Sequence, residues 1–528
     1  MAVSGSTKHD SGQRRIRPPG PRPVTVWLLG DQLTPRAASL EGLGPRDCRV
    51  LMVESLADAA RLPSHKQKIV LEWSAMRHFA DELRGLGYEV DHRPGERDLA
   101  SGLRGHLGEY RPAEVRIMAS ADHGVAEELA ETARAAGASV RILPNNMFIC
   151  GKDDFARWAE GRKLLRMEDF YHGTRRRTGL LMDGGAPECG TWNLDRMNRA
   201  VPPRGERFPP IPSFEADETT REVMRDVERR FGGHFGRLDG FAWPVTRADA
   251  ERFLDDFMER RLDLFGPYED AIVAGERALY HSLISPALNL GLLDPLDVAR
   301  RAEGRYREGA ARLNSVEGFV RQVIGWREFV RGVYATRMPG YIRSNRLGAD
   351  LPLPVFYWDA GTDMRCVADA IGSLIEHGIN HHIQRLMVTG NLALTAGVRP
   401  REVNDWYLLA YADAHEWVVT PNVIGMALHA DGGIVAAKPY AASAAYIDRM
   451  SDLCGGCRYS PRETIGERAC PYNALYWDFL ARHRERFERI PRMNLVMASL
   501  RKRSAVDLAD TRRRARSLRS TLRRGGRL

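Results

Sequence analysis

Short apolar runs alternate with amphipathic stretches through the first quarter of the chain. The amphipathic stretches cover residues 66–86 and 125–136, where apolar side chains recur at helical spacing. The apolar runs have the length of buried strands, and they cover residues 24–29, 50–53, 88–90, 115–118 and 140–143. Repeated strand and helix units predict a doubly wound α/β domain with a parallel sheet over residues 23–145.

This α/β domain carries neither a Gly-x-Gly-x-x-Gly loop nor a Gly-Lys-Ser/Thr loop, so no dinucleotide or nucleoside triphosphate site is predicted. A ligand of such a domain should lie outside the carboxyl ends of the strands. That rule selects Asp31 and Gln32 after the first strand and Glu54 after the second. Ordinary turn and cap roles remain the alternative for all three.

The remainder of the chain has a different pattern. Residues 146–213 are rich in Arg, Gly and Pro and predict a connector. Beyond them, over residues 214–500, the apolar periodicity is helical, with Gly, Pro and Asn between the segments, which predicts an all-α domain. The expected helices are 248–264, 268–274, 298–306, 317–335, 366–377, 383–394 and 477–489.

Length and charge narrow the class of protein. A chain of 528 residues exceeds what one core usually supports. The net charge of +9 favours a polyanionic partner such as nucleic acid. Residues 1–22 predict a disordered basic arm, and the basic tail 501–528 is either a nonspecific nucleic-acid contact or a solvated end. No membrane-spanning run or signal peptide is expected, which points to the cytoplasm.

Seven cysteines without a secretory signal argue against a disulfide framework. Cys454, Cys457 and Cys470 form a compact set of three ligands, and Cys366 is the candidate for the fourth. Thiolates suit both zinc and iron-sulfur clusters. The Gly455-Gly456 pair and the proline after Cys470 favour iron and sulfur, and structural zinc stays open.

Two other motifs suit a large, flat, phosphate-bearing ligand. Ser282-x-x-Ser285-Pro, followed by Asn289, places small hydroxyl groups at the start of a helix, where phosphate oxygens bind. The segment from Gln322 to Glu328 contains Trp326-Arg327, which can form one wall of a planar ligand. Helix caps and salt bridges would explain each motif on its own.

Taken together, these residues resemble the cryptochrome and photolyase superfamily, and more narrowly its bacterial iron-sulfur branch, the prokaryotic (6-4) photolyases. The resemblance covers residues 24–500. Its further points are Gly30-Asp31-Gln32-Leu33, residues 65–69 and 74–78, Ile324-Gly-Trp-Arg-Glu328, His381-His382, and the spacing of the four cysteines.

The resemblance implies three cofactors: FAD in the helical domain, a 4Fe-4S cluster on the four cysteines, and a ribityl-lumazine antenna (6,7-dimethyl-8-ribityllumazine) in the α/β domain. Antenna contacts are expected at Asp31, Gln32, Glu54 and Lys163. The expected FAD contacts are Tyr268, Ser282, Ser285, Asn289, Gln322, Trp326, Arg327, Arg385, Asp413 and Glu416.

The resemblance also assigns roles in catalysis. His382 is expected to donate a proton to the lesion with support from His381, because a histidine can exchange protons near neutral pH. Electrons should reach the flavin through Trp406, Tyr407 and Trp358, and the residues expected to face DNA are Met426, Tyr440 and Tyr446. The alternatives are that the histidines only hydrogen-bond the flavin and that the aromatic residues are ordinary packing.

The function implied is light-dependent repair of pyrimidine (6-4) pyrimidone photoproducts in UV-damaged DNA by a monomeric enzyme that does not use a membrane. A cryptochrome-like blue-light photoreceptor without repair activity is the first alternative. A zinc-stabilised nucleic-acid-binding protein without redox chemistry is the second.

Overall fold

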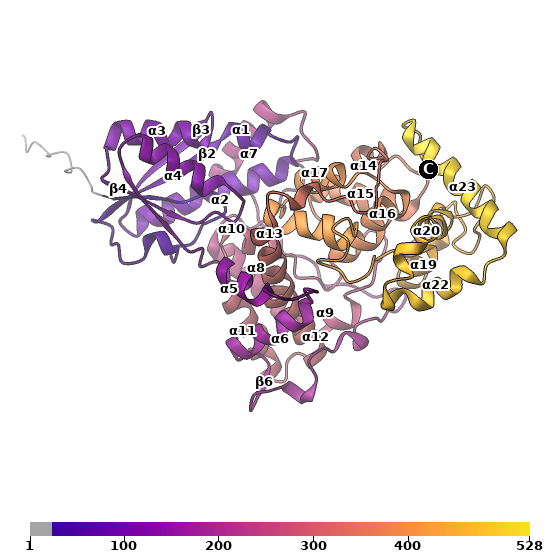
Figure 1. The fold of residues 1–528 in the computed structure, drawn as a ribbon. Coiled ribbons are helices and arrows are strands. Elements are labelled where there is room, and N and C mark those ends of the chain that lie inside the picture. Colours follow the sequence, from indigo (N-terminus) through magenta and orange to yellow (C-terminus); the bar gives the residue numbers. More distant parts are fainter. Residues whose placement is uncertain (1–23) are drawn as a thin grey trace, which may run out of the picture.

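The computed structural model describes residues 24–528, and the predicted arm over residues 1–22 lies outside this range. Five strands form one sheet in the order β3-β2-β1-β4-β5, and every neighbouring pair is parallel (Figure 1). The strands are β1 (Val24–Trp27), β2 (Cys48–Ser55), β3 (Glu89–Glu96), β4 (Glu114–Met118) and β5 (Ser139–Leu143).

Both faces of this sheet are buried, which explains why its strands read as continuous apolar runs. Side chains alternate between the faces along a strand, so the neighbours Val26 and Trp27 belong to different clusters of the core. The Trp27 face packs against α3 (Leu99–Tyr110) and α4 (Val125–Ala135). The Val26 face packs against α2 (Lys66–Gly85). The short elements η1 (Ala38–Leu40) and α1 (Leu56–Ala60) complete the unit.

Helix α3 has no counterpart in the sequence prediction. Its sequence contains three glycines and few apolar residues, so its periodicity is weak. A capping box starts it: the Asp98 side chain accepts a hydrogen bond from the Ser101 main-chain N–H, and the Ser101 hydroxyl oxygen accepts one from the Asp98 N–H. Local capping therefore compensates for poor intrinsic helix propensity.

The segment predicted as a connector, residues 146–213, contains two helices, and that prediction is wrong in this respect. They are α5 (Lys152–Ala159) and α6 (Met167–Thr178), followed by the hairpin β6 (Met182–Asp183) and β7 (Ala186–Pro187) and by η2 (Glu188–Gly190) and η3 (Asp195–Met197). Phe155 and Phe170 pack on each other and on Phe329, with ring centroids 5.4–6.0 Å apart. Burial of these rings stabilises a segment whose Arg, Gly and Pro content resembles a linker.

The rest of the chain is helical, as predicted, and its elements lie mainly in the lower and right-hand parts of Figure 1. A helix expected over residues 268–274 is absent, because α9 ends at its beginning and a turn follows. The elements up to the first cysteine ligand are α7 (Glu218–Phe231), α8 (Arg247–Arg260), α9 (Leu262–Tyr268), α10 (Ser285–Leu290), α11 (Pro295–Arg307), α12 (Leu313–Val320), η4 (Arg321–Trp326), α13 (Arg327–Arg337), η5 (Tyr341–Arg343) and α14 (Phe356–Asp359).

The elements that follow are α15 (Arg365–His377), η6 (Gln384–Gly390), α16 (Asn391–Ala396), α17 (Pro400–Ala410), α18 (Glu416–Thr420), η7 (Pro421–Ala427), α19 (Ala444–Met450), η8 (Leu453–Gly456), α20 (Pro471–Arg482), α21 (Arg484–Phe487), η9 (Pro491–Met493), α22 (Asn494–Arg501) and α23 (Ala505–Arg523). Three elements of the helical region, η4, η6 and η7, are π-helical turns. Such turns are rare in proteins, and those that occur are often found at functional sites.

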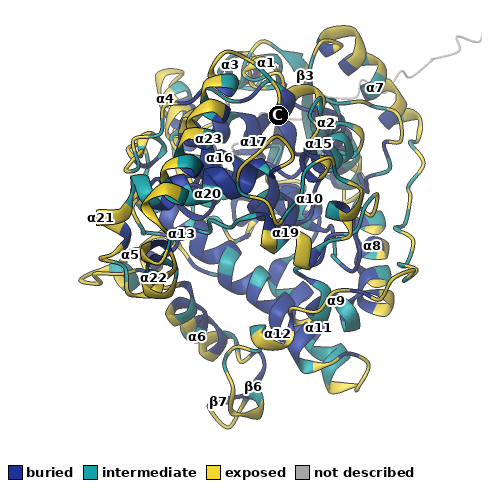
Figure 2. Cartoon of the chain, turned by 90° about the vertical axis from the view of Figure 1, so that its right-hand side faces the viewer, coloured by how far each residue is buried: buried dark blue, intermediate teal, exposed yellow. Residues whose placement is uncertain are grey.

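The basic tail after residue 500 is not a solvated disordered end. It folds into α23, which lies beside α20 (Figure 2) and buries Ala515, Leu518 and Leu522. The main-chain oxygen of Leu528 accepts a hydrogen bond from the Asp363 N–H at 2.7 Å. An apolar stripe at helical spacing among the arginines accounts for this packing.

Main-chain and side-chain bonds join the sheet unit to the helical region. The His65 N–H donates to the Leu409 carbonyl at 2.6 Å, and the Lys68 ammonium donates to the Leu408 carbonyl at 3.1 Å. Among the described residues, no helix has the length and apolar character needed to cross a membrane.

Candidate functional site

Three residues from two distant segments of the helical region, Ser285, Asn289 and Arg385, surround Asp413. Both carboxylate oxygens of Asp413 accept hydrogen bonds from the Arg385 guanidinium at 3.0 Å. The Ser285 hydroxyl donates to the same carboxylate at 2.6 Å, and the Asn289 amide donates to the Asp413 carbonyl at 2.9 Å. Burial alone would raise the pKa of Asp413, but the charge and hydrogen bonds of Arg385 outweigh it and lower that pKa.

Two adjacent histidines immediately before η6 differ in their surroundings. His381 is 3% exposed, whereas His382 is open to solvent. Surrounding protein nevertheless lowers the pKa of His382 to about 4, with a further contribution from the charge of Arg385. Arg385, whose side chain is 21% exposed, therefore acts on both His382 and Asp413.

The other residues predicted to contact FAD are placed less uniformly. Ser282, Gln322 and Trp326 are partly open to solvent, whereas Tyr268 stacks on Tyr280 with ring centroids 5.5 Å apart. Their contact with a cofactor stays a prediction.

Arg327 and Glu416 have protein partners away from the Asp413 cluster. Arg327 is buried, donates to the Glu328 carboxylate at 2.6 Å and stacks on Phe148. The Glu416 carboxylate lies 3.7 Å from the Arg61 guanidinium. The predicted position of Glu416 next to the flavin ring stays a prediction.

An assembly of aromatic rings surrounds Trp406, which is fully buried. The rings of Tyr357, Tyr407 and Tyr411 lie 4.9, 5.1 and 5.9 Å from it, and its indole N–H donates to the Tyr357 carbonyl at 3.0 Å. Tyr411 connects these rings to Arg385, whose guanidinium lies 4.1 Å from the centroid of the Tyr411 ring. Trp358 lies at the surface and is 43% exposed. The assembly thus runs from Tyr357, next to that surface residue, toward the Asp413 cluster.

The four predicted cysteine ligands converge. Cys366 comes from α15, Cys454 from η8, Cys457 follows η8 and Cys470 immediately precedes α20. All four line one small cavity, together with Tyr472 and other apolar residues. Burial raises the pKa of Cys470 to about 12 and that of Cys454 to about 11. Within the described residues, no three His, Cys, Asp or Glu side chains are grouped as a single metal ion would require.

Three of the four predicted antenna residues, Asp31, Gln32 and Glu54, lie at or near the carboxyl edge of the sheet. The buried Gln32 amide ties the end of β1 to the end of β4, since it donates to the Met118 carbonyl at 3.1 Å. Burial and the charge of Asp122 raise the pKa of Asp31 to about 7. Asp31 is therefore a carboxyl group that exchanges its proton near neutral pH.

Glu54 and Lys163 are placed differently from the first two antenna residues. Glu54 is 1% exposed, and its carboxylate pairs with Arg77 and His92 at 2.9 and 3.0 Å. Lys163 is exposed in the turn between α5 and α6. A contact of either residue with an antenna stays a prediction.

Of the residues predicted to face DNA, Met426 is placed differently by the structure. It is 5% exposed on the π-helical turn η7, because an apolar side chain on this packed element points inward. Tyr440 and Tyr446 are partly exposed. Tyr446 lies beside Arg449, whose guanidinium is 5.6 Å from its ring.

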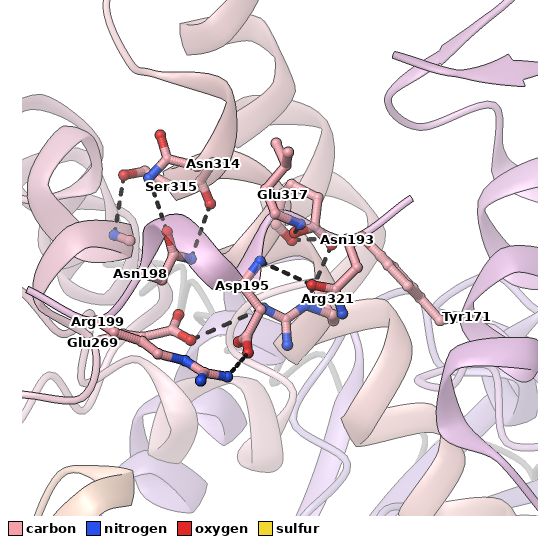
Figure 3. A network of polar contacts seen from close by, with 12 residues as sticks. Tyr171, Asn193, Asp195, Asn198, Arg199, Glu269, Asn314, Ser315, Glu317 and Arg321 are labelled. Carbon is pink, nitrogen blue, oxygen red and sulfur yellow. Dashed lines mark hydrogen bonds and ion pairs between the residues drawn. The ribbon is translucent and has the colours of Figure 1, made fainter. Parts of the chain in front are cut away.

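A polar network of charged residues interacts electrostatically with these tyrosines (Figure 3). The Asp195 carboxylate accepts hydrogen bonds from Arg199 at 2.8 Å and from Arg321 at 3.3 Å. Arg321 also donates to the Glu317 carboxylate at 3.3 Å and lies 3.9 Å from that of Glu269. Burial raises the pKa of Glu269 to about 8, so this carboxyl group keeps its proton at neutral pH.

Sequence reasoning missed three residues of the site: His281, Tyr357 and Tyr411. In the sequence, His281 and Tyr357 immediately precede the predicted site residues Ser282 and Trp358. Tyr411 lies two positions before Asp413. Position next to a motif was therefore the available signal. Only the folded chain shows that these rings contact His381 and Trp406.

Comparison with known proteins is consistent with this geometry. A family model described as deoxyribodipyrimidine photo-lyase-related protein matches residues 26–243. A solved class III photolyase from Agrobacterium tumefaciens aligns with a TM-score of 0.57 at 16% identity, covering 97% of this chain and 100% of the other. A Synechocystis cryptochrome aligns with a TM-score of 0.55 at 13% identity, covering 94% and 98%. The fold is thus that of the photolyases and cryptochromes.

Sequence similarity narrows the class further. The chain is 48% identical over 469 residues to a (6-4) photolyase of Agrobacterium fabrum (strain C58 / ATCC 33970), covering 88% of this chain and 92% of that protein. The chain therefore belongs to the (6-4) photolyase family.

Proposed function

We propose that this protein repairs pyrimidine (6-4) pyrimidone photoproducts in UV-damaged DNA in a light-dependent reaction that uses FAD. The observation that carries the proposal is the exposed His382, on which the charge of Arg385 acts, while Arg385 itself pairs with Asp413. The 48% identity to a (6-4) photolyase over most of both chains supports the same activity.

The residues present suit FAD. Ser285, at the start of α10, would hold its phosphates, because main-chain N–H groups attract anions there, and Asn289, in the last turn of α10, would hold its ribityl chain. Arg385 and Asp413 offer a guanidinium and a carboxylate with complementary hydrogen bonding for the edge of a flavin ring. The chemistry that FAD supplies when bound is light-driven electron donation.

The four cysteines suit a 4Fe-4S cluster. They line one small cavity, and thiolates are the ligands that such clusters require. Burial raises the pKa values of the Cys366, Cys454 and Cys470 thiols, so metal binding would have to displace their protons. We assign the cluster no step in repair.

The carboxyl edge around Asp31 suits the hydroxyl-rich side chain of a ribityl-lumazine antenna. Asp31 can donate as well as accept a hydrogen bond near neutral pH, and Gln32 fixes the edge by its bond to β4. The contribution of such an antenna when bound is light absorption.

The protein's own residues then perform defined tasks. His382, which is open to solvent, gives a proton to the lesion and takes it back, while the buried His381 supports it. Because its pKa is lowered in the free protein, the negative charge of bound DNA would have to favour its protonated form. Arg385 neutralises Asp413 and adds positive charge next to His382. Tyr440 and Tyr446 contact the DNA around a flipped lesion, whose weakened stacking lowers the cost of extrusion.

Irradiation of the purified holoprotein with an oligonucleotide that carries one (6-4) photoproduct tests this function. We expect light-dependent loss of the lesion, and a decrease of about 100-fold or more in His382→Ala with FAD still bound. His483→Ala is the matched control, because its ring lies between Phe479 and Phe487 and also has a pKa lowered to about 4. A bound flavin without lesion loss would instead indicate a photoreceptor.

A further inference from the structure

A short segment with a strained backbone precedes α10. Leu279 and Leu283 both adopt positive φ angles, 46° and 56°, although side chains that carry a Cβ atom disfavour this conformation. Both leucines are buried, at 1% and 6% exposure. Such strain persists only where the surrounding structure enforces it, and it is concentrated at functional sites. The residues held between the two leucines include His281 and Ser282.

The ring of His281 lies flat against the ring of His381. Their centroids are 4.7 Å apart and the planes differ by 10°. The His281 ring is itself fixed, since the edge of Phe265 packs against it at 5.6 Å and 89°. The Arg261 guanidinium holds the His281 main-chain carbonyl at 2.9 Å.

Hydrogen bonds do not orient the His381 ring. Neither of its nitrogens has a hydrogen-bond partner among residues 24–528, and both are buried. Packing is therefore what fixes this ring, and His281 covers one of its faces. A buried imidazole without polar partners gains nothing from its orientation unless the orientation serves a ligand.

The charged groups around these rings are mostly positive. Arg261 and His382 face His281, whereas His281, His382 and Arg385 face His381. The nearby carboxyl groups do not offset them, because Asp413 is paired with Arg385 and Glu269 keeps its proton. Burial is the main cause that lowers the pKa of His281, to about 3, and it also lowers that of His381.

We propose that His281 is a positioning residue for the lesion-facing histidines: its ring covers one face of His381, fixes the orientation of that ring and excludes water from it. His381 stays neutral and immobile as a result, and proton exchange with the lesion is confined to His382, which is open to solvent. This proposal rests on the repair function proposed above.

Two substitutions separate packing from other roles. His281→Phe keeps a flat ring against His381, whereas His281→Ala removes the ring and admits water. We expect His281→Ala to lower the repair yield per absorbed photon by about 10- to 100-fold, the loss that misplaced reacting groups produce. We expect His281→Phe to stay within about threefold of the wild type. FAD content and affinity for lesion DNA should change by less than about twofold in both variants, because neither depends on the orientation of His381.

A titration that needs no repair activity completes the test. In holoprotein with ring-¹³C-labelled histidines, water admitted by His281→Ala should raise the lowered pKa of His381 toward its ordinary value. His281→Phe should leave that pKa unchanged, and His483→Ala is again the control. Equal damage by Phe and Ala, or no change in either repair or titration, would overturn the positioning role. Absence of repair in the wild type would instead reject the proposed function, and the titration would still decide the role of His281.

Discussion

Replacement of Asp413 by Asn tests the electrostatic core of the site. The change removes the carboxylate that pairs with Arg385 through two 3.0 Å hydrogen bonds and leaves the guanidinium charge without a counter-ion. Loss of one partner of a buried ion pair costs about 3–5 kcal/mol. The Arg385 side chain is 21% exposed, so we expect the lower limit, about 3 kcal/mol, or a decrease of about 3 °C in the thermal midpoint of a chain of this length.

Thermal unfolding and the ratio of FAD to protein are the measurements. Arg385→Gln combined with Asp413→Asn removes both charges and should recover most of the lost stability, because no uncompensated charge then remains. Asp350→Asn is the matched control, since its surface pair with Arg523 has side chains 60% and 50% exposed and should contribute less than about 1 kcal/mol. An Asp413→Asn protein that unfolds like this control would refute the reasoning.

The pH dependence of the same pair has a defined sign. The folded-state pKa of Asp413 lies below its ordinary value of 3.8. Its stabilisation is therefore fully present above about pH 4 and is lost as the pH falls through the lower folded value. The difference in stability between wild type and Asp413→Asn should be constant from pH 5 to pH 8 and should shrink only below that window.

Two further predictions concern the aromatic and cysteine residues. Trp406→Phe should slow light-driven reduction of bound flavin by about tenfold or more, equivalent to about 1.4 kcal/mol of barrier. Anaerobic bleaching at the flavin band measures this rate, and Trp243→Phe, at another buried tryptophan, is the control. An unchanged rate would exclude Trp406 from the electron-transfer path. Cys470→Ser should abolish iron and sulfide in the purified protein while the exposed Cys189→Ser keeps both; zinc in the wild type would contradict the cluster.

Hydrophobic periodicity was sufficient for the fold class. The five strands and α2 were predictable because a parallel sheet buried on both faces leaves uninterrupted apolar runs. Elements stabilised by a cap or by distant rings were not predictable in this way. Helix α3 depends on the capping box at Asp98, and α5 depends on the contact of Phe155 with Phe329.

The candidate site divides in the same manner. Ser285, Asn289 and Asp413 were named from motifs, and the cysteines from their spacing, because chemistry of this kind needs particular residue types at short intervals. Orientation was beyond such reasoning. Sequence could not tell that Met426 points inward or that Glu416 pairs with Arg61, since helix packing and a partner from another domain decide both.

The sequence by itself determined which residue types this protein brings to its chemistry: a histidine pair, a Trp-Tyr pair and four thiols. Only the tertiary structure decided which of these side chains are buried and which are open to solvent. His381 is enclosed under the ring of His281 while His382 is open to solvent, although the two are adjacent in the chain. Burial and ring contacts depend on segments up to a hundred residues away, and no local pattern encodes them.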